Sequence, residues 1–199
     1  MTPRQIGLLL LLAGLALGLP SALEYGLSPR IAHERLAADE RALLDLLPAD
    51  SYDNRPLARP ISLPDSPLPA WLATRQGAPV AVLLPSTAQG YEGPIRLLVA
   101  VDPQGRLLGV KVLEQQETPG IGDRIEAGKS AWLSGFIGKS LVAPPPPQWR
   151  VRADEGAFDQ IAGATITSRA VVAAVQQTLQ LFDRQRALLL PPPAETVHE

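Results

Sequence analysis

The chain of 199 residues has no cysteine and only two histidines. The lack of cysteine excludes disulfides, thiolate-bound iron–sulfur clusters, haem attached through cysteine and a cysteine nucleophile. His33 and His198 lie in no cluster of ligand-type residues, so a histidine-based metal site is not expected. The basic residues are scattered and the net charge is −2, which argues against nucleic acid as a partner. We therefore expect the chain to bind neither a metal nor a nucleic acid.

One long uncharged run is present, the leucine-rich segment Ile6–Leu23. Its length is at the short end of what crosses a bilayer core. A cleaved signal peptide is the alternative, because the run is N-terminal, but it has no Ala-x-Ala site and exceeds the usual apolar length of roughly 7–15 residues. We expect an uncleaved transmembrane helix over residues 6–24. Because Arg4 precedes it, residues 1–5 are expected in the cytoplasm and the bulk of the chain outside it.

Residues 25–69 are predicted to join this span to a domain. Ser28 followed by Pro29 is typical of a helix start, and an irregular apolar face continues to Leu47, which predicts an amphipathic stalk helix. Residues 50–69 contain five of the 21 prolines and are predicted to be an extended linker or a strand-edge segment on the domain surface. The domain is expected over residues 70–190. A disordered tail over 191–199 is expected after it.

The order of elements in the domain predicts an α+β fold, in which helices pack on one side of an antiparallel sheet. Four apolar segments at hairpin spacing predict the strands: Ala70–Arg75, Val80–Leu84, Ile95–Val101 and Leu107–Leu113. Three later segments are predicted to be a helix, a short strand and a final helix: Ile125–Ile137, Trp149–Arg152 and Arg169–Leu189. A Rossmann-type domain is disfavoured, because no glycine-rich fingerprint follows the first strand.

The stretch Asp159–Ser168 places the small residues Gly163 and Ala164 directly before hydroxyl side chains at the start of a predicted helix. Small residues let a bulky group approach the backbone. A helix start offers free N–H groups and a partial positive charge, which suit a phosphate. Ser168 is predicted to cap the helix. On local chemistry alone, a glycine turn followed by a capped helix explains this pattern better than a ligand site.

A second segment, Glu117–Asp123, follows directly on a predicted strand. By itself it is typical of a polar loop with a turn at its proline. Gly120 and Gly122 would also allow a close approach to the backbone, Thr118 can donate a hydrogen bond, and Glu117 can accept one. The segment could therefore cover a ligand at the end of the hairpin.

A third segment, Gly90–Gly93, precedes a predicted strand. By itself it is an ordinary turn, in which Tyr91 is expected to pack on the core.

Taken in order, these segments resemble the covalent FMN-binding domain family. Asp-x-x-Ala-Gly-Ala-Thr over Asp159–Thr165 resembles its flavinylation motif, with Ala162 where the motif usually has Ser or Thr. Glu-Thr-Pro-Gly-x-Gly-Asp over Glu117–Asp123 resembles its second landmark, and Gly-Tyr-x-Gly over Gly90–Gly93 its third. With the N-terminal apolar run, the chain resembles the G subunit of the Rnf (Rsx) ion-translocating electron-transport complexes, which is related to the C subunit of the sodium-pumping quinone reductase.

The resemblance implies FMN joined through its phosphate to Thr165 by a separate flavin transferase that uses FAD as donor. Asp159 would assist that attachment. No residue of this chain is then catalytic. The remaining expected cofactor-binding residues make room for the flavin, bond to it or donate to its phosphate: Glu117, Thr118, Gly120, Gly122, Gly163, Ala164, Thr167 and Ser168.

The resemblance also implies a cellular location and a role for the chain. The chain would be an electron-carrying subunit of a bacterial inner-membrane complex, single-pass, with its bulk on the periplasmic side. Other membrane subunits would be its partners, and the complex would link ferredoxin and NAD redox chemistry to ion transport. The chain would be a redox subunit of a translocase rather than an enzyme alone. The alternative is an anchored extracytoplasmic structural or sensory module that binds flavin reversibly or not at all.

Overall fold

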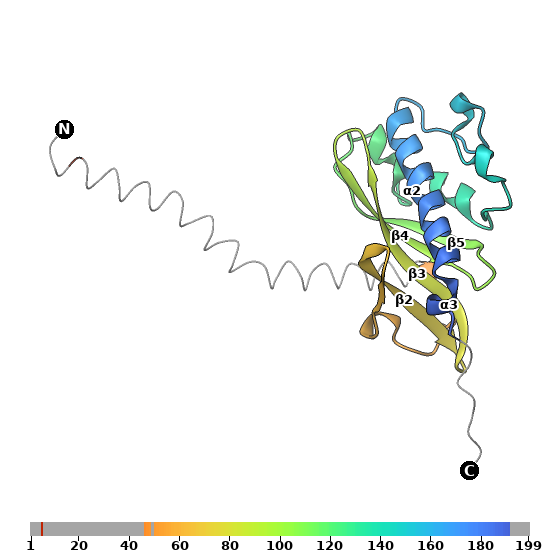
Figure 1. The fold of residues 1–199 in the computed structure, drawn as a ribbon. Helices are drawn as coiled ribbons and strands as arrows, with labels where there is room; N and C mark the ends of the chain where they lie inside the picture. Colours follow the sequence, from red (N-terminus) through yellow and green to blue (C-terminus); the bar gives the residue numbers. More distant parts are fainter. Residues whose placement is uncertain (1–4, 6–45, 49, 192–199) are drawn as a thin grey trace, which may run out of the picture. The chain divides into compact units, whose positions relative to one another are not determined.

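The computed structural model describes residues 5, 46–48 and 50–191 (Figure 1). The predicted span over 6–24, most of the predicted stalk helix and the tail beyond residue 191 lie outside these residues. Within the described part, no helix has both the length and the apolar character needed to cross a membrane.

The predicted antiparallel sheet is confirmed, with five strands instead of four. Each strand pairs with the next along the chain, in the order β1-β2-β3-β4-β5 (Figure 1). The strands are β1 (Ile61–Leu63), β2 (Ser66–Arg75), β3 (Ala78–Gln89), β4 (Pro94–Val101) and β5 (Leu107–Glu114).

The sheet begins inside residues 50–69, as the strand-edge alternative for this segment predicts. β1 pairs with β2 through Ile61 opposite Ala70 and Leu63 opposite Ser66. Pro67 and Pro69 have no N–H group to donate, and proline is tolerated in strands chiefly at sheet edges. The prolines of this segment therefore mark the edge of the sheet.

Both faces of the sheet are buried, because successive side chains of a strand point to opposite faces. On β4, Leu97 and Val99 belong to the larger apolar cluster, which also contains the buried face of helix α2 (Thr165–Arg184). Leu98 and Ala100 belong to a second cluster on the other face, together with Leu47 and Trp71. Each fully buried Leu or Val side chain of these clusters contributes roughly 1.5–3 kcal/mol to folding. The sheet and the buried face of α2 thus share one core, and this core fixes where the start of the helix lies.

The segment between β5 and α2 differs from the prediction. The helix predicted over Ile125–Ile137 is wrong: two short 3-10 helices, η2 (Gly122–Ile125) and η3 (Trp132–Phe136), take its place. An aromatic cluster holds the segment, with the ring centroids of Phe136 and Phe158 4.8 Å apart and those of Trp149 and Phe158 also 4.8 Å apart. Side-chain packing therefore replaces regular backbone hydrogen bonding here.

Two further boundaries also differ. The strand predicted over Trp149–Arg152 is reduced to a single bridge between Val151 and Phe158, between the 3-10 helices η4 (Pro146–Gln148) and η5 (Arg152–Asp154). The final helix is divided into α2 and a short α3 (Arg186–Leu189).

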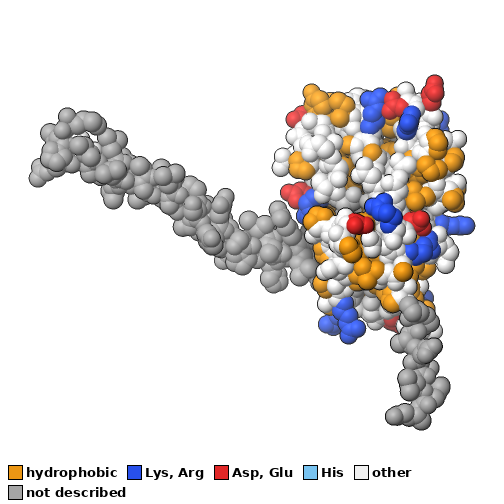
Figure 2. Space-filling model, in the orientation of Figure 1, with side chains coloured by type: hydrophobic (Ala, Val, Ile, Leu, Met, Phe, Trp, Pro, Cys, Tyr) orange, Lys and Arg blue, Asp and Glu red, His pale blue; other side chains and the backbone are white. Residues whose placement is uncertain are grey.

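Figure 2 shows Lys and Arg side chains interspersed with Asp and Glu over one face of the domain.

Candidate functional site

The helix α2 starts four residues earlier than predicted. Gly163 has a φ of +81°, which lets the chain turn directly into the helix, and Ala164 occupies the N-cap position. The predicted capping role of Ser168 is wrong. Ser168 is fully buried one turn inside the helix, where its hydroxyl donates to the Ala164 carbonyl at 2.9 Å and accepts the Ile161 N–H at 3.0 Å. Ser168 therefore ties the turn to the helix from the inside.

Thr165 is the first residue of α2 and is half-buried. No side chain in the described part of the chain caps this helix. The N–H groups of its first turn have no partner within the helix, so a partial positive charge remains beside Thr165. The Thr165 hydroxyl itself has no hydrogen-bond partner among the described residues, unlike the hydroxyls of Thr167 and Ser168.

Glu117 lies where three segments meet. It is 4% exposed, and its carboxylate accepts the N–H groups of Tyr91 at 3.3 Å and Glu92 at 3.1 Å. The Thr167 hydroxyl also donates to it. Three segments that resemble the FMN-binding family, separate in the sequence, are thus joined at one carboxylate.

The loop after Glu117 is folded on itself. The Thr118 carbonyl accepts the N–H groups of Ile121 at 3.1 Å and Gly122 at 3.0 Å, and its hydroxyl donates to a Glu92 carboxylate oxygen at 3.1 Å. The Asp123 carboxylate accepts the Gly120 N–H at 2.8 Å and lies 2.9 Å from the Lys129 ammonium.

The pKa of Asp123 is held below its ordinary value, mainly by the hydrogen bond from Lys129 and to a smaller extent by that from Gly120. An ionised Asp123 therefore stabilises the fold above the unfolded pKa of about 3.9 and loses this effect as pH falls through the lower folded pKa. We expect Asp123→Asn to lower the melting temperature at pH 7, with a difference from wild type that shrinks below about pH 4. Thermal melts across pH measure this. Asp50→Asn, at an exposed site outside the loop, is the control, and a difference independent of pH would contradict the prediction.

A pocket of about 450 Å³ lies between the loop and the start of α2. It is lined by Tyr91, Glu117, Thr118, Ile121, Gly122, Gly163, Ala164, Thr165, Ile166 and Thr167. All the predicted site residues except Gly120 and Ser168 line it. Gly120 lies in the turn that Asp123 closes, and Ser168 lies inside the helix.

Three apolar side chains at this pocket are exposed: Tyr91 at 66%, Ile121 at 44% and Ile166 at 50%. The expectation that Tyr91 packs on the core is wrong. Ile121 and Ile166 were not predicted. The sequence carried a signal for both. Ile121 lies between two loop glycines. Ile166 lies between two threonines, at a helix position that the apolar period does not require to be buried. Together they give the pocket an apolar rim.

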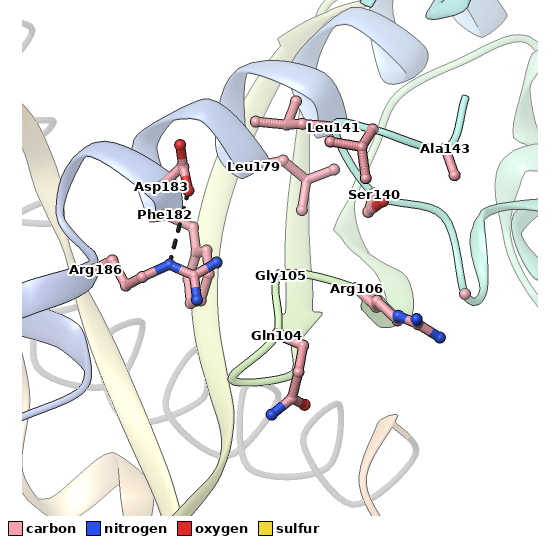
Figure 3. A pocket seen from close by; sticks show the side chains of 12 residues that line it. Gln104, Gly105, Arg106, Ser140, Leu141, Ala143, Leu179, Phe182, Asp183 and Arg186 are labelled. Carbon is pink, nitrogen blue, oxygen red and sulfur yellow. Dashed lines mark ion pairs between the residues drawn. The ribbon is translucent and has the colours of Figure 1, made fainter. Parts of the chain in front are cut away.

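A second cavity of about 450 Å³ lies near the other end of α2 (Figure 3). Arg186 at its edge stacks 5.0 Å from the Phe182 ring centroid, donates to the Pro103 carbonyl at 2.8 Å and pairs with Asp183 at 3.7 Å. These contacts tie the end of the helix to the β4–β5 turn. None of the predicted site residues lines this cavity, so we place the candidate site at the pocket beside Thr165.

Residues 90–180 match the family model of the FMN-binding domain. That range runs from the Gly90 turn through the loop to most of α2, and so includes every wall of the pocket.

Relatives extend the match to nearly the whole chain. The G subunit of the ion-translocating oxidoreductase complex of Pseudomonas aeruginosa is 48% identical, over 98% of this chain and 95% of the relative. The corresponding G subunit of Cereibacter sphaeroides is 47% identical, over 94% of this chain and 85% of the relative. The chain belongs to the family of G subunits of ion-translocating oxidoreductase complexes. Among solved structures, NqrC of Shewanella oneidensis is 26% identical, over 72% of this chain and 75% of that one, with a TM-score of 0.48.

Proposed function

We propose that this chain carries FMN, joined through its phosphate to the Thr165 oxygen, and relays electrons as a subunit of a membrane-bound ion-translocating oxidoreductase. One observation carries the proposal. Of the hydroxyls in the motif, that of Thr165 has no hydrogen-bond partner in the described part of the chain, and Thr165 lines the pocket at an uncapped helix start.

The surroundings of Thr165 suit a phosphate. The free N–H groups of the first turn of α2 and the helix dipole favour negative charge at that point. Gly163 has no Cβ, and a Cβ placed there would lie 3.2 Å from Ile121. The glycine therefore keeps the passage between the loop and the helix open. Thr167 and Ser168, whose hydroxyls are engaged elsewhere, support the turn from behind.

The pocket also suits the ring system of a flavin. Its volume falls in the range of roughly 300–1,000 Å³ that is usual for sites of small organic ligands. The exposed side chains of Tyr91, Ile121 and Ile166 offer apolar contact to a planar ring, and the polar groups of Thr118 lie at the same wall. When bound, FMN supplies one-electron and two-electron redox chemistry, while the chain positions it.

The charge of the pocket favours covalent attachment over reversible binding. Its lining residues include no Lys or Arg, and Glu117 is the charged residue among them. A free phosphomonoester carries a charge of about −1.5 to −2 at pH 7 and usually requires cationic partners. A phosphodiester formed with Thr165 carries a single negative charge, for which the uncapped helix start is a sufficient partner. The covalent bond would then retain the cofactor without a cationic clamp.

In this proposal a separate flavin transferase uses FAD as donor. The Thr165 oxygen forms a bond to the FMN phosphorus, the bond from that phosphorus to AMP breaks, and the proton of the hydroxyl is released. The predicted span over 6–24 would anchor the domain to the inner membrane with its bulk on the periplasmic side. Other subunits would supply the ferredoxin and NAD reactions and the ion path.

Intact mass spectrometry tests the proposal. Full-length protein co-expressed with a flavin transferase should gain the mass of one FMN less one water, and its band should stay fluorescent in a denaturing gel. Protein made without the transferase should show neither. Flavin that leaves the chain on denaturation would indicate the reversible module instead. An unmodified chain without any flavin would exclude both the covalent carrier and the reversible flavin module.

A further inference from the structure

We infer that Glu117 is not a flavin ligand but, together with Thr167, a positioning residue that holds the Thr165 hydroxyl in place for attachment. The inference rests on the proposed attachment at Thr165. It concerns how the fold makes that one hydroxyl reactive.

The hydrogen-bonding capacity of Glu117 is directed into the protein. Its carboxylate takes two backbone N–H groups, from Tyr91 and Glu92, and the Thr167 hydroxyl. A buried carboxylate is costly unless such donors satisfy it. These donors lie on two segments that are distant in the sequence, so satisfying Glu117 forces the segments together.

Two neighbouring segments approach Glu117 so closely that they have no room for a side chain at the point of contact. A Cβ at Gly90 would lie 2.3 Å from Glu117 Oε1, and a Cβ at Gly122 would lie 2.8 Å from Glu117 Cβ and 2.9 Å from its Oε2. Gly122 has no positive φ, and Gly90 none either, so close approach and not backbone strain explains the two glycines. Glycine at both positions lets the turn and the loop close on the carboxylate.

The hydrogen bond between Thr167 and Glu117 also fixes the position of Thr165. Both residues lie in the first turn of α2, which no side chain of the described residues caps. Helix ends without caps fray readily. The bond between Glu117 and Thr167 holds that turn against the loop, so the Thr165 hydroxyl keeps one position on the pocket wall. A misplacement of about 1 Å at a reacting atom can lower a rate about 100-fold.

The same contacts select one hydroxyl among several. The hydroxyls of Thr167, Ser168 and Thr118 each donate to a protein oxygen. Thr167 and Ser168 are also at most 1% exposed. Among the threonine side chains that line this pocket, only that of Thr165 has a hydroxyl without a partner in the described part of the chain.

The test measures attachment kinetics. Full-length protein made without flavin is incubated with purified flavin transferase and FAD, and the initial rate of fluorescent labelling gives kcat and KM for the acceptor protein. Thr167→Val, which keeps the shape but removes the hydroxyl, should lower kcat about 10- to 100-fold. KM should change less than about twofold, because the exposed residues around Thr165, such as Asp159 and Ile166, are unchanged.

Three further variants separate positioning from general damage. Thr167→Ser keeps the hydroxyl and should restore kcat to within about threefold of wild type. Glu117→Gln should lower kcat as Thr167→Val does, because one amide N–H₂ would then face a backbone N–H. The double variant should be no slower than the slower single one, since both remove the same contact. The matched control is Thr178→Val, a buried threonine of α2 whose hydroxyl donates to Ala174 at 2.8 Å, far from the pocket.

The outcomes are distinct. If wild type is not labelled, the proposed function fails. If wild type is labelled and both Thr167→Val and Glu117→Gln match it in kcat, the inference is wrong. It is also wrong if Thr178→Val is as slow as Thr167→Val, or if thermal melts show that both site variants are unfolded, since the contact then serves folding and not positioning.

Discussion

Thr165→Ala is expected to abolish covalent flavin while the domain stays folded. The substitution removes the one threonine hydroxyl of the pocket that has no partner among the described residues, and alanine is a good residue for the first turn of a helix. Because no described hydrogen bond is lost, we expect the free energy of unfolding to change by less than about 0.5 kcal/mol. Labelling should fall to background, since the other two threonine hydroxyls at the pocket, those of Thr118 and Thr167, each donate to a carboxylate.

Intact mass and in-gel fluorescence read the labelling, and thermal melting reads the fold. Thr165→Ser is the matched control: it retains a hydroxyl at the same position and should still be labelled. If Thr165→Ala is labelled to the same extent as wild type, the flavin is attached at another residue. Peptide mapping of the labelled protein would then identify that residue.

The second large effect is expected for Phe136→Ala. Phe136 is 1% exposed, lies 4.8 Å from the ring of Phe158 and meets Trp132 edge-on at 5.3 Å between centroids. The segment between β5 and α2 has only short 3-10 helices, so this aromatic cluster supplies much of its packing. Removing a buried phenylalanine side chain typically costs about 3–5 kcal/mol, through lost burial and the cavity that remains.

Denaturant unfolding of the full-length protein measures this cost. Ile137→Ala is the control, because Ile137 is the next residue in the chain and is 58% exposed. It should change the free energy of unfolding by less than about 0.5 kcal/mol. Equal losses for the two variants would show that the cluster does not carry the stability of this segment.

Much of the domain could be predicted from the sequence wherever local rules apply. The apolar runs of β4 and β5 were predicted within one residue of their observed bounds, whereas β3 extends beyond the predicted Val80–Leu84 at both ends. In the turn between β4 and β5, Asp102 accepts the N–H groups of Gln104 at 2.9 Å and Arg106 at 2.8 Å, which is the local bonding that favours aspartate at a turn. The apolar period of α2 likewise predicted its buried face, because that period depends only on the geometry of a helix.

The boundaries and irregular parts could not be predicted in this way. Ser168 has the chemistry of a cap, but Gly163 allows the helix to start earlier, so the serine is buried inside it. Ile125–Ile137 contains apolar residues at spacings compatible with a helix, but the aromatic cluster fixes 3-10 turns there. In both cases contacts from elsewhere in the chain outweigh local preference.

The candidate site divides along the same line. The sequence by itself determined where the motif lies, that Thr165 is its last threonine and that a glycine-rich loop follows the hairpin, because these are properties of neighbouring residues. Only the tertiary structure decided that Glu117 meets Thr167 across fifty positions, that Ser168 faces inward and that Tyr91, Ile121 and Ile166 form an exposed rim. The reason is physical. Whether a hydroxyl is bonded or free depends on donors and acceptors that folding brings together, and their distance in space cannot be read from their separation along the chain.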